Sequence, residues 1–164
     1  MNDSSGARND RGLSFETIGV PIASKEDAEV TCGVIGPYLS NRTTVVLIHV
    51  IKKAGGGIDH TPVERQRIRG ERSFDRCIDR LSIPSRRITT TTIFHTNLVD
   101  GILEGARKND VDAIVFTPRS ANRLIKLVSG DTAFGLVHET DRPLLVVPSA
   151  DGERDPQRAN DEHE

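Results

Sequence analysis

Short apolar runs alternate along this chain with segments whose apolar residues recur at helical spacing. The β-branched apolar runs predict strands near residues 15–22, 43–51, 87–95, 112–117 and 143–148. The helical spacing predicts helices near residues 25–39, 62–82, 98–109 and 131–141. Such alternation implies crossover connections and a parallel sheet covered on both faces. The pattern therefore predicts an α/β fold with a single open five-stranded sheet.

Polar residues mark where these elements begin and where the domain ends. Ser24, Thr61-Pro62 and Asn97 predict the starts of the first three helices, and Pro37 predicts an early end or a kink for the first. The polar composition of residues 1–13 and the acidic composition of residues 150–164 are typical of disordered tails. We therefore expect one α/β domain over residues 14–149.

Composition limits the partners and the compartment. The chain has 164 residues, 35% of them hydrophobic, which suffices for one domain with a real core. A formal net charge of −2 gives no general attraction for nucleic acid or an anionic membrane, so we expect no specific nucleic-acid binding. No apolar window approaches the length of a membrane span and no secretory signal is visible, so we expect no membrane insertion and a cytoplasmic location.

The two cysteines, Cys32 and Cys77, fit no metal-binding spacing. The simplest interpretation is a pair of core-facing thiols in a reducing compartment, with a disulfide as the less favoured alternative.

The last third of the chain contains the candidate ligand site. The apolar strand at 112–116 leads through a basic loop to Gly130-Asp131 and a helix, an order of elements that can bind an anion at the helix N-terminus. Asp131 opposes this, because its carboxylate would satisfy the helix N–H groups and repel a phosphate. The sequence therefore favours a loop that only connects strand to helix.

This segment resembles the C-terminal signature of the universal stress protein family. In that signature a glycine follows the strand, a second glycine comes three residues later, and a third precedes Ser or Thr after nine more residues. Here Thr117, Ser120, Gly130 and Asp131 occupy the four positions, and Arg119 matches a common family residue. At the end of the first strand, Ala23 stands where the nucleotide-binding branch has an aspartate.

The resemblance implies a Rossmann-type sandwich like that of the nucleotide α-hydrolases, with strand order 3-2-1-4-5 and helices on both faces. Ligands of such sheets lie beyond the carboxyl ends of the strands. The resemblance also implies a homodimer formed through the final strand, Leu144–Val147, whereas a tail folded over that edge is the competing interpretation. The degenerate binding residues are Ala23, Thr117, Arg119, Ser120, Gly130 and Asp131.

Two further sets of residues offer weaker candidates. The second predicted helix carries an arginine stripe that could bind an acidic surface, but acidic neighbours favour a solvated face with salt bridges such as Arg72 to Asp75 and Arg76 to Asp79; the stripe comprises Arg65, Arg69, Arg72, Arg76 and Arg80. His49 and His95 fall at strand ends without a partner that would suggest a triad or a metal site.

The sequence thus favours a non-enzymatic homodimer that acts through an unidentified protein partner, with no cofactor and no metal. An adenine-nucleotide sensor that binds ATP through a rebuilt loop over Thr117–Asp131 is the alternative, and an enzyme on the same scaffold is the least favoured.

Overall fold

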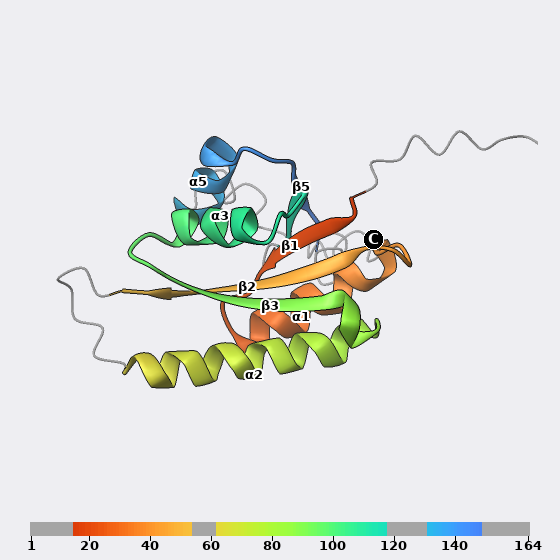
Figure 1. The fold of residues 1–164 in the computed structure, drawn as a ribbon, viewed down its shortest axis with the longest axis horizontal. Helices are drawn as coiled ribbons and strands as arrows, with labels where there is room; N and C mark the ends of the chain where they lie inside the picture. The colour runs from red at the N-terminus through yellow and green to blue at the C-terminus, as the bar shows by residue number, and fades with distance from the viewer. Residues whose placement is uncertain (1–14, 54–61, 118–130, 149–164) are drawn as a thin grey trace, which may run out of the picture.

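A computed structural model describes residues 15–53, 62–117 and 131–148, with the backbone alone for residues 131–133. Figure 1 shows strands and helices alternating along the described chain. The strands are β1 (Thr17–Pro21), β2 (Thr44–Lys52), β3 (Ile88–His95), β4 (Ala113–Phe116) and β5 (Leu144–Val146). The helices are α1 (Lys25–Ile35), α2 (Val63–Leu81), α3 (Leu98–Lys108) and α5 (Asp131–Glu139), with short 3-10 turns η1 (Gly36–Tyr38) and η2 (Ser85–Arg87).

The five strands form one parallel sheet in the order β3-β2-β1-β4-β5. The register sets Val20 of β1 beside Leu47 of β2, and Val115 of β4 beside Leu145 of β5. Both the fold class and the strand order expected from the sequence are confirmed. The order reverses between β1 and β4, where two crossovers leave in opposite directions.

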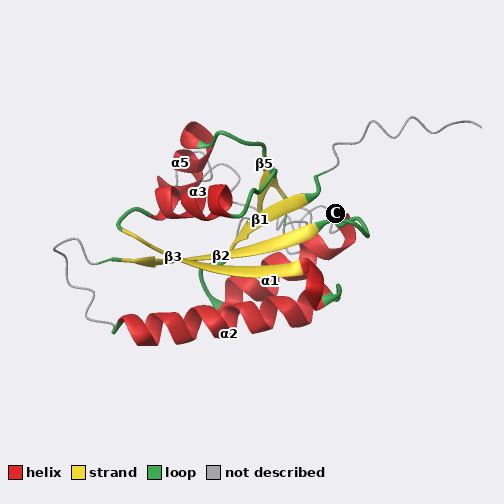
Figure 2. Cartoon of the chain, in the orientation of Figure 1, coloured by secondary structure: helices red, strands yellow, loops and turns green. Residues whose placement is uncertain are grey.

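Helices cover both faces of the sheet, as Figure 2 shows. On one face α1 and α2 pack against the sheet through a core cluster that includes Cys32, Phe74 and Leu81. On the other face α3 and α5 pack through a cluster that includes Leu103 and Leu136. The interior strand β2 contributes alternate residues to the two clusters, which accounts for its nearly continuous apolar sequence.

The polar residues at the helix starts act as the sequence predicts. The Ser24 side chain accepts the backbone N–H of Asp27 to cap α1, and the Asn97 side chain accepts the N–H groups of Val99 and Asp100 to cap α3. The α1 helix ends at Ile35, and Pro37 lies in the 3-10 turn that follows. Thr61 lies outside the described residues, and α2 begins directly after Pro62.

The two cysteines do not form the pair of free, core-facing thiols that the sequence favoured. Cys32 of α1 and Cys77 of α2 form a disulfide, with their Cα atoms 5.3 Å apart, and both residues are fully buried. The thiols do face the core as expected, but they face each other across the helix pair, which sequence spacing alone does not reveal. Within the described part of the chain, no helix combines the length and apolarity that crossing a bilayer requires.

Candidate site at the carboxyl edge of the sheet

Parallel strands bring their carboxyl ends to one edge of the sheet, and the candidate residues gather there. Ala23 follows β1, His49 lies near the end of β2 and Thr117 follows β4 directly. Backbone hydrogen bonds continue to this edge, from Ile22 N–H to Ile48 O at 2.8 Å and from Val147 N–H to Phe116 O at 3.0 Å. The edge is therefore fixed by the sheet on both sides of the switch point.

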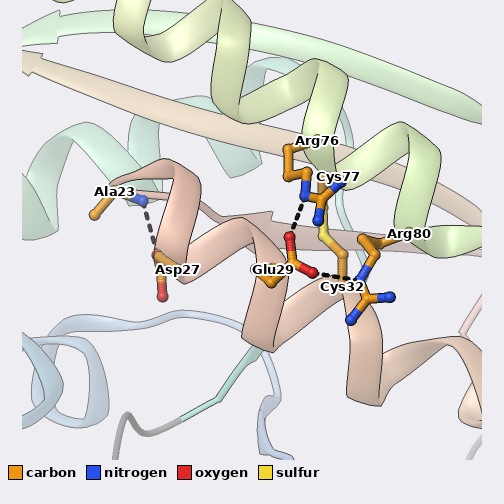
Figure 3. Close-up of a disulfide and its surroundings, with 7 residues drawn as sticks. All are labelled: Ala23, Asp27, Glu29, Cys32, Arg76, Cys77 and Arg80. Carbon is orange, nitrogen blue, oxygen red and sulfur yellow. Dashed lines mark hydrogen bonds and ion pairs between the residues drawn. A yellow bond between two sulfur atoms is a disulfide. The ribbon is translucent and has the colours of Figure 1, made fainter.

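A carboxylate holds the end of β1 at this edge. Asp27, in the first turn of α1, accepts the backbone N–H of Ala23 through Oδ2 at 2.8 Å, as Figure 3 shows. Ser24 in return accepts the N–H of Asp27 at 3.2 Å. The two bonds form a variant of the capping box, displaced by one residue. Ser24 was predicted from the sequence as a helix start but Asp27 was not, although the spacing Ser-x-x-Asp is the signal that could have found it.

Thr117 presents a polar atom that the described protein does not satisfy. The residue is 5% exposed, and its Oγ1 has no hydrogen-bond partner within the described ranges. A buried hydroxyl without a partner costs free energy, so it is either a strained feature or a group that binds something else. Among the predicted site residues that the structure describes, Thr117 is the one with an unpaired polar side-chain atom that a ligand could bind.

The other predicted residues lie partly outside the described chain. Arg119, Ser120 and Gly130 fall in residues 118–130, which the structure does not describe. Asp131 is the first residue of α5, as the sequence predicts. Ala23 is exposed at the edge, with its N–H bonded to Asp27.

His49 is a structural residue. It is 7% exposed, and its Nδ1–H donates to Ile22 O at 2.8 Å, which links β2 to β1. Its ring meets Phe74 edge to face, and it lies against Gly70 of α2. The His95 side chain bonds the backbone of Asn97, two residues along the chain. Over the described residues, no group of three or more His, Cys, Asp or Glu side chains could bind a metal ion.

A second polar cluster joins α1 to α2 beside the disulfide. Glu29 pairs with both Arg76 and Arg80, the latter at 3.0 Å between Arg80 Nε and Glu29 Oε1 (Figure 3). The hydrogen bond from Arg76 lowers the pKa of the Glu29 carboxyl and raises the pKa of the Arg76 guanidinium. Arg76 therefore pairs across the helices, and the expected ion pair to Asp79 along α2 is replaced by one to Glu29.

Comparisons with known proteins agree with this architecture. The sequence profile of the universal stress protein family matches residues 14–148. The fold is similar to a universal stress protein from Archaeoglobus fulgidus, with a TM-score of 0.59 at 17% identity over 81% of this chain and 98% of that one. No curated protein matches the chain by sequence.

Two similar structures contain nucleotides. One is a universal stress protein from Archaeoglobus fulgidus in complex with dAMP, with a TM-score of 0.55 at 13% identity over 82% of this chain and 98% of that one. The other is a universal stress protein in complex with cAMP, with a TM-score of 0.53 at 11% identity over 84% of this chain and 99% of that one. At such identities the likeness concerns the fold.

Proposed function

The chain belongs to the universal stress protein family, and from that premise we propose that it is a cytoplasmic, homodimeric regulator that acts through protein contacts without tight ATP binding. The observation that carries this proposal is the Asp27 carboxylate, which occupies the backbone N–H of Ala23 at the edge where a nucleotide would lie. A fixed negative charge there disfavours a polyphosphate, and an occupied N–H is no longer available as a donor.

Titration calorimetry with ATP, ADP, AMP and cyclic nucleotides, with and without magnesium, tests the absence of tight binding. We expect no saturable binding below about 100 µM, because each lost donor or added like charge costs on the order of 1–3 kcal/mol. A nucleotide that binds more tightly than this would contradict the proposal.

Two variants test whether the charge of Asp27 is what prevents tight ATP binding. Asp27→Asn keeps an acceptor for Ala23 N–H but removes the charge, and we expect it to raise ATP affinity by about tenfold. Asp75→Asn is the matched control, since Asp75 is exposed on α2, and it should leave ATP binding unchanged. Equal affinities in both variants would show that Asp27 does not determine nucleotide binding.

The proposed dimer pairs β5 with its copy. β5 is an edge strand, and Val146 is 42% exposed on it, so pairing would protect both the open backbone and an apolar side chain. Leu145 packs partly against the core of its own chain, so a charged substitution there would also disturb the fold. Val146 is therefore the better position at which to test the dimer.

Thr117 favours a second candidate function, an adenine-nucleotide sensor with a rebuilt loop. Its buried, unsatisfied hydroxyl at the carboxyl edge would gain a partner from a ligand. Thr117→Val distinguishes the two functions: without a ligand the variant should be more stable by about 1 kcal/mol, because an unpaired polar atom is removed. If the sensor function holds, the same variant lowers adenylate affinity by about tenfold in calorimetry.

No catalysis is part of the proposal. His49 and Asp27 at this edge are both engaged by backbone groups. An enzyme would require a nucleophile and a base within hydrogen-bond reach of each other.

A further inference from the structure

The five arginines of α2 fall into two sets. Arg76 and Arg80 pair with Glu29 of α1. Arg65, Arg69 and Arg72, which we call the upstream arginines, are exposed and make no ion pair or side-chain hydrogen bond within the described part of the chain. Of the nearby acids, Glu64 and Glu71 are both bonded to Arg67, and the salt bridge expected from Arg72 to Asp75 is absent from the described part of the chain.

This arrangement is electrostatically unfavourable as it stands. The upstream arginines follow one another at positions i, i+4 and i+7, so their charges are neighbours on one side of α2. Arg65 also lies in the first turn of the helix, where the helix dipole disfavours positive charge. An anionic partner placed along the upstream arginines would relieve both effects.

The chain itself carries such an anion. Residues 149–164 hold two arginines, Arg154 and Arg158, against six acidic residues: Asp151, Glu153, Asp155, Asp161, Glu162 and Glu164. A tethered segment has an effective concentration in the millimolar range, which favours it over free anions.

Residue 148 and the start of α2 lie at the same edge of the sheet. Residue 148 follows β5, whose carboxyl end lies at the same edge of the parallel sheet as the end of β2, and α2 starts beyond that edge (Figure 1). Val147 packs into the cluster on the face that α1 and α2 cover. Asp151, Glu153 and Asp155 lie three to seven residues beyond residue 148, and an extended chain of that length spans about 10–25 Å.

We propose that the acidic segment 149–164 docks on the upstream arginines of α2. In extended conformation Asp151, Glu153 and Asp155 share one side at intervals of about 6.6 Å, while Arg154 lies on the other side. The step from Arg65 to Arg69 is about 6 Å along the helix, and that from Arg69 to Arg72 is about 4.5 Å. Long guanidinium side chains absorb the difference, so three ion pairs form in register and cover α2 against nucleic acid or anionic lipid.

NMR relaxation of the full chain tests this contact. In the wild type at low salt we expect backbone order parameters of about 0.8 for residues 151–155, falling below about 0.6 in R65Q/R69Q/R72Q. The same fall is expected in about 0.5 M salt, which screens exposed charges. The variant D151N/E153Q/D155N removes the acidic charges on the other side of the proposed contact. It alters no contact within the described residues.

The matched control is R42Q/K52Q/R86Q, which removes three exposed cations outside the upstream arginines and should leave residues 151–155 ordered. Low order parameters in the wild type at low salt would overturn the proposal, as would an equal loss of order in the control. It would also be overturned if the tail stayed mobile while short duplex DNA or anionic vesicles shifted the α2 amide signals, because the arginines would then serve an external anion.

Discussion

Gly70 sets how closely α2 lies on the sheet. A Cβ atom at this position would come within 2.6 Å of His49 Cδ2, which is closer than real side-chain contacts allow. His49 cannot easily give way, since its Nδ1–H is bonded to Ile22 O and its ring meets Phe74. One missing side chain therefore allows a buried imidazole to connect two strands and a helix.

We expect Gly70→Ala to destabilise the protein by about 1–3 kcal/mol through overpacking, although alanine is the better helix former. Gly33→Ala is the matched control, because its added Cβ meets nothing closer than Arg80 Nη2 at 3.7 Å, and it should stabilise by about 0.5–1 kcal/mol. Urea unfolding of both variants measures the difference. If both substitutions stabilise, the close contact between Gly70 and His49 is not a constraint.

At the scale of elements, α1 and α2 behave as one unit. Glu29 bonds two arginines of α2, and the disulfide joins the same pair of helices one turn further along α1. Both connections lie on the face opposite α3 and α5.

The Glu29 connection should depend on pH. Because Arg76 lowers the folded-state pKa of Glu29, the pairing stabilises the protein above the ordinary value of 4.5 and is lost as the pH falls through the lowered pKa. We expect Glu29→Gln to lower the melting temperature at neutral pH, and the difference from the wild type to vanish below about pH 4. Melting curves between pH 7 and pH 3 test this, with Glu16→Gln as an exposed control; a difference that persists in acid would contradict it.

The disulfide should contribute more to the stability of the protein than the Glu29 pairing does. Closing a loop with a sequence separation of 45 lowers the entropy of the unfolded chain, which corresponds to about 4 kcal/mol of stability. We expect the double variant C32A/C77A to lose about that amount in chemical unfolding, and a reductant to have no effect on the variant. Intact-mass spectrometry of protein alkylated directly in cells shows whether the bond forms there; two alkylated cysteines would indicate that the thiols are free.

The positions of the strands and helices could be predicted from the sequence, but the side-chain contacts between helices could not. Apolar periodicity, Ser24, Pro37 and Asn97 act locally, so strands and helices could be located from the chain. The strand order came from the family resemblance, and the structure confirms it. The pairing of Glu29 with Arg76, and of Cys32 with Cys77, depends on how two helices lie side by side, which no local pattern encodes.

The candidate site was predictable in place but not in detail. The carboxyl edge of the sheet follows from the α/β class alone, and Ala23 and Thr117 both lie there. That the Thr117 hydroxyl would be buried and unpaired could not be foreseen, because its surroundings come from separate strands.

At the scale of the whole molecule, the sheet has two edges, β3 and β5. β3 contains the hydroxyl-rich run Thr89–Thr92, in which Thr89 and Thr90 are exposed, whereas β5 is short and apolar. The difference favours β5 as the edge that pairs with a second copy.

We expect a dimer whose melting temperature rises with protein concentration, since association stabilises the folded state. Val146→Lys should abolish that dependence and halve the mass measured by light scattering, because a buried lysine opposes strand pairing. Val63→Lys, at a residue 58% exposed on α2, is the control and should leave the dimer intact. A wild-type monomer at high micromolar concentration would exclude the dimer.

The covalent link between α1 and α2 also limits how far the chain can be stretched. The segment between Cys32 and Cys77, which contains the interior strand β2, cannot be extended by tension applied at the two termini. In optical-tweezer traces, the oxidised protein should thus extend by about 160 Å less than the reduced protein. β2 would remain inside the disulfide-closed loop, and tension could extend it only after the disulfide is reduced.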